Sequence, residues 1–249
     1  MIARVSSFVL ILGLAAPLQA ASPALQRVVA AAHASGYLEP RIVAAAEQRC
    51  ATALCFANFL AERLPARVRL ERTVHPDTDT IRWVRTRPSI EAVERDVEGL
   101  VRLRLSHFGR KALGEMQTLL ERRTGGIPNF DLEIDLRGNP GGDFERMLAL
   151  AGLLIGPRPD SVDIRRRQVS ERRALSGPLT RRWTVRRVII DETTDSAALI
   201  LARILTRQGG ATLIGVDEKP ETVFVKRRIA IAQNWRLVIP IALVSSVGN

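Results

Sequence analysis

The sequence VIIDETTDSAALILARILTRQGGATLIG, from Val188 to Gly215, predicts a strand, a turn, a helix and a second strand in succession. The run Val188–Ile190 is apolar and β-branched, and it is too short for a helix. After a polar turn, apolar residues recur at steps of three and four, which is the period of a helix with one apolar face. A glycine pair ends that helix, and Ala211–Ile214 is expected to form the second strand.

Ser196 stands at the expected start of this helix, and two interpretations of it compete. In the first it caps the helix, because a serine oxygen accepts hydrogen bonds from the free backbone N–H groups there. Thr194 or Asp195 could cap equally well. In the second it is a nucleophile, because a hydroxyl at this place is easily exposed and the same N–H groups can stabilise an oxyanion. This stretch alone favours the cap.

A second strand, loop and helix lie upstream. Leu132–Leu136 reads as a strand, Arg137–Gly142 (RGNPGG) as a glycine-rich loop, and Asp143–Ile155 as a helix with a strong apolar face. Glycines let backbone N–H groups turn toward one point, which suits an oxyanion or a phosphate. The loop lacks the Lys-Ser/Thr ending of a P-loop and is not GxGxxG, so nucleotide binding is disfavoured. In isolation, a plain tight turn is the better interpretation.

Taken together, the two loops resemble those of the tail-specific (C-terminal processing) serine peptidases, relatives of the tricorn core protease and the interphotoreceptor retinoid-binding repeats. In that family a DLRxNxGG loop ends a strand, and about fifty residues later a Ser-Ala pair opens a helix. Here Asp135–Gly142 (DLRGNPGG) and Ser196-Ala197 occupy these places. The resemblance covers roughly Leu100–Leu243 and implies an α/β fold with a ClpP/crotonase-like core of strand-strand-helix units.

The resemblance also implies peptide-bond hydrolysis, and it gives a role to each matching residue. Ser196 falls on the nucleophile that forms an acyl-enzyme. The backbone N–H groups of Ala197 and of Gly141 or Gly142 fall on the oxyanion hole. The expected partner is a peptide or protein substrate, with no cofactor and no metal.

The general base is where the chain departs from the family pattern. Many members place a lysine twenty-five residues after the serine, within Gly-Lys-Gly, and here that place holds Glu221. Lys219 could serve as the base if the loop shifts, and Lys226 is the other nearby lysine. The acidic neighbours of Lys219 would keep its amine protonated, so an ordinary loop lysine competes with the catalytic interpretation.

The N-terminal region predicts export and a small helical appendage. The first twenty residues, MIARVSSFVLILGLAAPLQA, resemble a secretory signal peptide, so the chain is expected to be periplasmic or secreted, with no transmembrane segment afterwards. Residues 21–67 have helical periodicity, residues 68–99 are expected to be connecting strands and linker, and residues 100–249 the peptidase-like core. The segment after Pro65 is too short for the peptide-binding PDZ domain of many relatives, and His75 is interpreted as a turn residue.

Cys50 and Cys55 are the only cysteines. In an exported protein their spacing suggests a local disulfide, but in an unbroken helix positions five apart diverge too far for a bridge. Either the helix breaks near residues 51–54, or both thiols are buried as small apolar groups. With no further ligands at suitable spacing, a zinc site is disfavoured.

The net charge of +11 favours anionic partners. Arginine is spread through the whole chain and no nucleic-acid-binding motif accompanies it, so a solvated basic surface is the better interpretation and a specific nucleic-acid site is not expected. Three hypotheses follow: an exported serine peptidase, a peptidase-fold protein that binds a peptide or partner without turnover, and a basic module for anionic polymers.

Overall fold

The computed structural model describes residues 21–72, 88–95, 100–124, 129–166, 169–179, 182–216, 219–232 and 234–247. The signal-like segment 1–20, His75 and most of the connecting segment expected at residues 68–99 lie outside these residues. None of the helices in the described ranges is long and apolar enough to cross a membrane.

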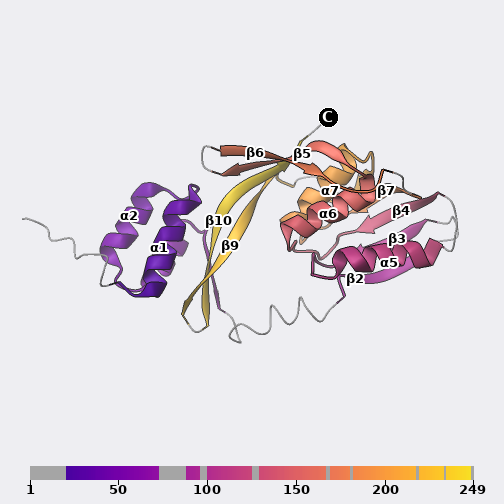
Figure 1. Cartoon of the computed structure of the whole chain (residues 1–249). Helices are drawn as coiled ribbons and strands as arrows, with labels where there is room; N and C mark the ends of the chain where they lie inside the picture. Colours follow the sequence, from indigo (N-terminus) through magenta and orange to yellow (C-terminus); the bar gives the residue numbers. More distant parts are fainter. Residues whose placement is uncertain are drawn as a thin grey trace, which may run out of the picture.

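A five-stranded sheet, mostly parallel, lies at one end of the molecule (Figure 1). Its strands pair in the order β2-β3-β4-β7-β8, with only β2 antiparallel. The strands are β2 (Ile90–Arg95), β3 (Val101–Leu105), β4 (Phe130–Asp135), β7 (Trp183–Ile189) and β8 (Thr212–Ile214). The alternation of strands and helices in the sequence therefore predicted the mixed α/β architecture correctly.

Three helices pack against one another and against this sheet. They are α5 (Ala112–Thr124), α6 (Phe144–Ile155) and α7 (Ala197–Arg207). Strand β3 shows which face they cover, since Leu103 and Leu105 are buried while Arg102 and Arg104 are exposed. Each helix follows one strand and precedes the next, so the loops after β4 and β7 meet at the same edge of the sheet.

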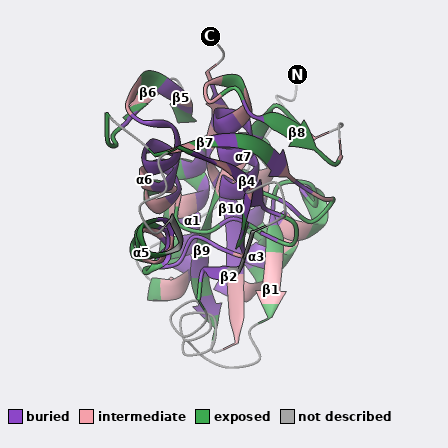
Figure 2. Ribbon diagram, turned by 90° about the vertical axis from the view of Figure 1, so that its right-hand side faces the viewer, coloured by how far each residue is buried: buried purple, intermediate pink, exposed green. Residues whose placement is uncertain are grey.

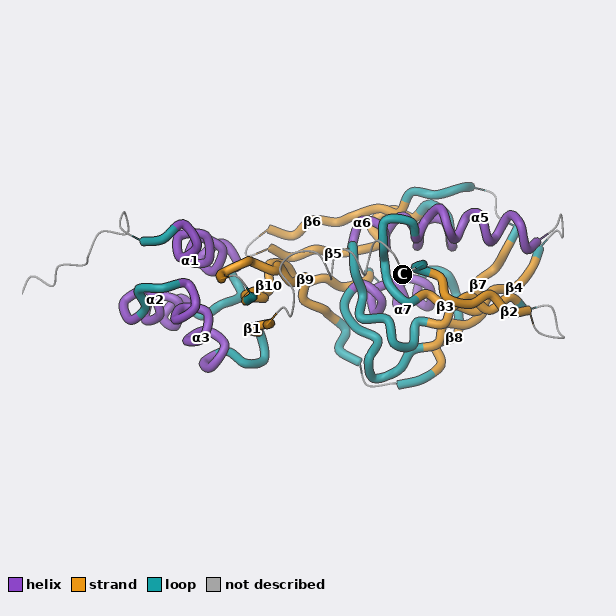
Figure 3. The backbone as a smooth tube through the Cα atoms, turned by 90° about the horizontal axis from the view of Figure 1, so that it is seen from below, coloured by secondary structure: helices purple, strands orange, loops and turns teal. Residues whose placement is uncertain are grey.

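An antiparallel sheet forms the middle of the molecule, and its long hairpin β9–β10 reaches toward the N-terminal helices (Figures 1 and 3). Its strands are β1 (Arg69–Arg72), β5 (Arg158–Arg166), β6 (Val169–Leu175), β9 (Thr222–Ala232) and β10 (Trp235–Ser246). Strand β10 pairs with β9 along one edge and with β1 and β5 along the other.

The sequence of strand β6 reads as a loop, and the structure shows that this interpretation is wrong. Its sequence, VSERRAL, has no apolar alternation, because only its last residue, Leu175, is buried. Pairing with β5 holds it in the sheet instead. A hydrophobic period cannot identify a strand that is exposed on both faces.

The N-terminal helices α1 (Pro23–Ser35), α2 (Pro40–Arg49) and α3 (Ala53–Arg63) share a core with the hairpin. Their buried side chains, such as Phe56 and Leu60, pack in one cluster with Ile229 and Leu237. Figure 2 shows the result, with β10 buried in the middle of the molecule and β8 exposed at the edge of its sheet.

Cys50 and Cys55 form a disulfide, with Cα atoms 5.4 Å apart. The helix breaks between them, since α2 ends at Arg49 and α3 begins at Ala53. The hydroxyl of Thr52 accepts a hydrogen bond from the N–H of Cys55 and caps α3. Of the two alternatives left open by the sequence, the broken helix with a bridge is the one found.

Candidate active site

Ser196 precedes helix α7 in a backbone conformation that few residues adopt. Its φ is 56° and its ψ is −126°, and its side chain makes no capping hydrogen bond. The interpretation of Ser196 as a helix cap was therefore wrong. A residue other than glycine in such a conformation costs on the order of 1–3 kcal/mol, and residues of this kind concentrate at functional sites.

The loop after β4 and the loop after β7 lie against each other. Three hydrogen bonds join them: the hydroxyl of Thr194 donates to the carbonyl of Leu136 (2.9 Å), the N–H of Gly138 to the carboxylate of Asp191 (3.1 Å), and the N–H of Asp195 to the carbonyl of Asn139 (3.1 Å). Two bends about fifty positions apart in sequence thus meet at one place, as the motif spacing predicted.

Gly141 brings the two loops into contact beside Ser196. A Cβ atom at Gly141 would lie 2.9 Å from Cβ of Ser196 and 2.9 Å from the backbone nitrogen of Ala197. Its φ is +98°, a backbone angle that residues with a side chain rarely adopt. Both conditions require glycine at this position of the loop.

Asn139 fixes the shape of the same loop from inside. Its side chain is fully buried, its amide nitrogen donates to the carbonyl of Leu105 (2.9 Å), and its amide oxygen accepts from the N–H of Gly141 (2.8 Å). The N–H of Gly141 is therefore engaged. Within the described ranges, the N–H groups of Gly142 and Ala197 have no hydrogen-bond acceptor.

Asp191 anchors the turn that leads to Ser196. Partial burial raises the pKa of this carboxyl, but hydrogen bonds from Thr193, Gly138 and Thr194 outweigh it and lower the pKa to about 2. The sequence marked Asp191 only as turn material, because its acceptor role depends on Gly138 from the other loop. The ionised form of Asp191 therefore holds both loops together.

Arg137 has a similar role in the loop after β4. Its backbone N–H and guanidinium both donate to the buried carboxylate of Asp135, at 3.0 Å and 2.6 Å. Burial raises the pKa of Asp135, and the hydrogen bonds from Arg137 lower it by more. Within the Asp-Leu-Arg part of the motif, Arg137 therefore binds Asp135, and this pair supports the loop and does not line the cleft.

A cleft of about 320 Å³ opens beside Ser196. One side, here termed the loop wall, comes from the two loops and helices α6 and α7: Pro140, Gly142, Phe144, Asp195, Ser196, Ala197 and Ile200. The other side, termed the sheet wall, comes from β1, β9 and β10: Arg69, Glu71, Val223, Val225, Lys226, Arg228, Val238 and Val244. Ser196 thus lines the same cleft as several apolar side chains and the cations Arg69, Lys226 and Arg228.

The two candidate bases lie in different places. Lys226 lines the cleft with Ser196, from strand β9. Lys219 does not line it, and its amine donates to the backbone carbonyl of Glu192 instead. Glu221, at the position where relatives carry the lysine, forms an ion pair with Arg207.

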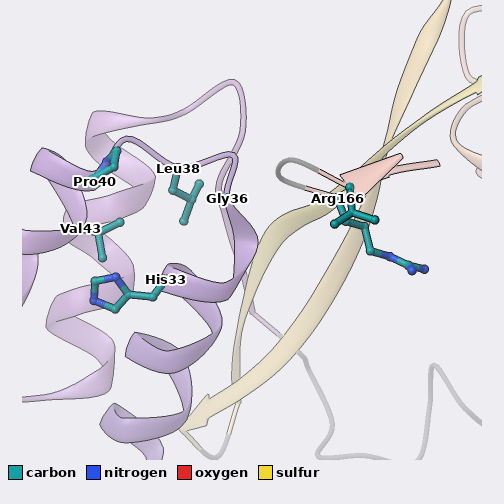
Figure 4. A pocket seen from close by; sticks show the side chains of 8 residues that line it. His33, Gly36, Leu38, Pro40, Val43 and Arg166 are labelled. Carbon is teal, nitrogen blue, oxygen red and sulfur yellow. The ribbon is translucent and has the colours of Figure 1, made fainter. Parts of the chain in front are cut away.

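A larger cavity of about 700 Å³ lies between the N-terminal helices and hairpin β5–β6 (Figure 4). His33, Leu38 and Val43 line it from the helices, and the guanidinium of Arg166 points away from them (Figure 4). None of the described residues that line it is a serine, threonine or cysteine. This cavity therefore lacks a nucleophile, and the cleft at Ser196 is the candidate active site.

Comparison with known proteins gives a family and a fold. Residues 100–247 match the sequence model of peptidase family S41. Over 150 residues, the chain is 31% identical to a carboxyl-terminal-processing protease of Picosynechococcus sp.. That match covers 56% of this chain and 35% of the relative, so the chain spans only about a third of the relative's length.

Two solved structures resemble the chain over most of its length. A lipoprotein from Streptococcus agalactiae has a TM-score of 0.63 at 13% identity, covering 91% of this chain and 86% of that one. A candidate peptidase from Parabacteroides merdae has a TM-score of 0.55 at 12% identity, covering 90% of this chain and 82% of that one. Both likenesses concern the fold, and both extend beyond the residues that match the family model.

Proposed function

The chain belongs to peptidase family S41, and on that premise we propose that it is a serine peptidase whose nucleophile is Ser196. The observation that carries the proposal is the geometry of Ser196. Its backbone is strained, its hydroxyl is not used to cap helix α7, and Gly141 of the second loop lies in contact with it. Strain at a side chain that opens onto a cleft is typical of a positioned nucleophile.

The reaction begins when the hydroxyl oxygen of Ser196 attacks the carbonyl carbon of a peptide bond. A base takes the hydroxyl proton, and negative charge develops on the carbonyl oxygen. The intermediate then expels the amine, which receives the proton from the protonated base, and an acyl-enzyme remains. Water, deprotonated by the same base, releases the acid and restores the serine.

The backbone N–H groups of Ala197 and Gly142 are the proposed oxyanion hole. Each comes from a different loop, and both residues line the cleft. Within the described ranges neither N–H has another acceptor, whereas the N–H of Gly141 donates to Asn139. Preorganised donors of this kind usually contribute several kcal/mol to catalysis, about 3–4 for a single oxyanion-hole donor.

Lys226 is the proposed base in preference to Lys219. It shares the cleft with Ser196, whereas the amine of Lys219 is bound to a backbone carbonyl outside it.

Membership of family S41 also supports proposals on the arrangement of the core and on the location of the protein. The peptidase-like core is proposed to have the ClpP/crotonase-like arrangement, preceded by a helical region at residues 21–67 and a connecting segment at residues 68–99. Export to the periplasm or beyond is proposed from the signal-like sequence of the first twenty residues. A disulfide between Cys50 and Cys55 agrees with an oxidising compartment.

A serine-directed fluorophosphonate tests the proposal. The purified protein is expected to be labelled, and Ser196→Ala is expected to abolish the labelling while leaving the thermal unfolding transition in place. Thr193→Ala, in the same turn, is the matched control and should still be labelled. Labelling that persists in Ser196→Ala would remove Ser196 from the mechanism.

A second candidate function is peptide binding without turnover. It is favoured by the loss of the family lysine, whose place holds Glu221 in an ion pair with Arg207. Under this alternative, peptides bind the cleft but the wild-type protein neither reacts with a fluorophosphonate nor cleaves them. Labelling of the wild-type protein at Ser196 would exclude it.

A further inference from the structure

The sheet wall of the cleft carries residues that lie outside the family match. Arg69 and Glu71 belong to strand β1, which precedes residue 100, where the match begins. Pairing of β1 with β10 places Arg69 beside Val238 and Glu71 beside Arg236. Long-range antiparallel pairing thus adds a charged edge to a cleft whose other residues belong to the family segment.

Arg69 is one of three residues in a row across this wall. Val238 pairs with Arg69 on one side and with Arg228 on the other, and residues paired in this way point to the same face. All three line the cleft. Two guanidinium groups therefore flank one valine on the cleft surface.

The two arginines differ in their partners. The guanidinium of Arg228 forms an ion pair with the carboxylate of Glu71 at 3.0 Å. Within the described ranges, the guanidinium of Arg69 has no carboxylate or hydrogen-bond partner. Of these two arginines, Arg228 is thus neutralised and Arg69 can receive an anion from outside.

We propose that Arg69 is a specificity-determining residue that binds a carboxylate of the peptide lying in the cleft. This inference rests on the proposed function of the same cleft. A guanidinium offers a planar pair of donors that matches the two oxygens of a carboxylate, and such bonds are stronger than those between neutral groups. The carboxylate comes either from an acidic side chain or from the C-terminus of the peptide.

The strand register also gives the position of this subsite. Lys226 pairs with Pro240, and Arg228 follows two residues later on the same face of β9. Two residues of a strand span about 7 Å. Arg69 lies in the same row as Arg228, so an extended peptide that runs along these strands with its reacting bond beside Lys226 meets Arg69 about two residues away from that bond.

Arg72 provides a matched control on the same strand. It is exposed like Arg69, but it lies three positions along β1 and so points to the opposite face. Its guanidinium lies 5.9 Å from the ring of Trp235, away from the cleft lining. Replacing it changes the net charge by the same amount without touching the cleft.

The experiment measures peptide binding to the Ser196→Ala protein, so that no turnover is needed. The probes are three dansyl-labelled hexapeptides of alanine and valine. One carries an internal glutamate and an amidated C-terminus, one carries glutamine and a free C-terminus, and one carries glutamine and an amidated C-terminus. At least one peptide with a carboxylate is expected to bind about fivefold more tightly than the peptide without one.

Arg69→Gln in this background is expected to reduce that ratio to about one, Arg69→Lys to keep part of it, and Arg72→Gln to leave it unchanged. Thermal unfolding confirms that each variant is folded. A ratio that survives Arg69→Gln, equal binding of all three peptides, or no binding of any would overturn the proposal. Failure of the proposed hydrolysis is seen separately, as a wild-type protein that does not react with a fluorophosphonate.

Discussion

The two walls of the Ser196 cleft are held in place in different ways. Backbone hydrogen bonds, a buried asparagine and a glycine without room for a side chain fix the loop wall. The sheet wall rests on strand pairing, and its polar side chains are exposed or paired only by a surface ion bridge. The loop wall therefore tolerates almost no change, whereas the side chains of the sheet wall can vary without loss of the fold.

Apart from Lys226, this difference separates the groups of the reaction from those of recognition. A nucleophile and an oxyanion hole require positions held to within a fraction of an ångström, which backbone contacts provide. Selection among peptides requires only that a few side chains change, which an exposed strand permits. Variants in the two walls should therefore differ in their effects on the reaction, on stability and on the choice of peptide.

The largest effect is expected for the one residue of the sheet wall that would take part in the reaction. Lys226→Met removes the proposed base and should slow fluorophosphonate labelling by about a thousandfold, within the range of general-base catalysis. Lys219→Met is the matched control and should label at nearly the wild-type rate. Slow labelling of Lys219→Met with a nearly wild-type rate for Lys226→Met would identify Lys219 as the base and would contradict the assignment of Lys226.

Gly141→Ala should have the next largest effect, because it disturbs the loop wall at its tightest point. The new Cβ would lie 2.9 Å from Cβ of Ser196, at a φ of +98°. Displacement of the nucleophile should slow labelling by about a hundredfold, and strain should lower the free energy of unfolding by about 1–3 kcal/mol. Gly114→Ala, in helix α5 with open space around it, is the control: it should leave the labelling rate unchanged and raise the free energy of unfolding by up to about 1 kcal/mol, because alanine favours a helix more than glycine does. Wild-type behaviour of Gly141→Ala would show that the two loops are not in contact.

Asp191→Asn should weaken the loop wall in a manner that depends on pH. The pKa of Asp191 in the folded state is about 2, below its ordinary value of 3.8, so the folded state favours the ionised carboxylate. Its stabilisation is complete above pH 3.8 and is lost as the pH falls through about 2. Denaturant unfolding should therefore give a difference of about 1 kcal/mol between wild type and variant at pH 7, shrinking at pH 2. A difference that is the same at both pH values would contradict the role of the ionised form.

Glu71→Gln should have the smallest effect, because it changes only the exposed ion pair of the sheet wall. The free energy of unfolding should fall by less than about 0.5 kcal/mol. Release of Arg228 should raise the affinity for carboxylate peptides about twofold, measured with the dansyl peptides in the Ser196→Ala background. A large loss of stability would show that the sheet wall is as constrained as the loop wall.

The same division explains what the sequence could predict. The residues of the loop wall belong to local sequence motifs, namely DLRGNPGG and the Ser-Ala pair, and to the strands and helices around them. The sequence therefore predicted the mixed α/β fold, the meeting of the two loops and the candidate nucleophile. It could not show that Asp191 accepts a hydrogen bond from Gly138, because that contact joins residues of different loops.

The sheet wall could not be predicted, because it depends on pairing between distant strands. Arg69 reaches the cleft only through its register with Val238, and a single sequence carries no signal of that pairing. Lys226 was one of the two lysines that the sequence offered as candidate bases, and only the position of β9 placed it in the cleft with Ser196. The interpretation of Ser196 as a helix cap failed for a related reason. Ser196 contacts Gly141 of the other loop and has an unusual backbone conformation, and neither feature can be read from the local sequence.

The most direct test of the central claim is the site of covalent modification. The wild-type protein is allowed to react with a fluorophosphonate, digested, and mapped by tandem mass spectrometry. A single adduct on the hydroxyl of Ser196 is the predicted result. An adduct on any other residue, or none after complete reaction of a control serine peptidase, would contradict the account.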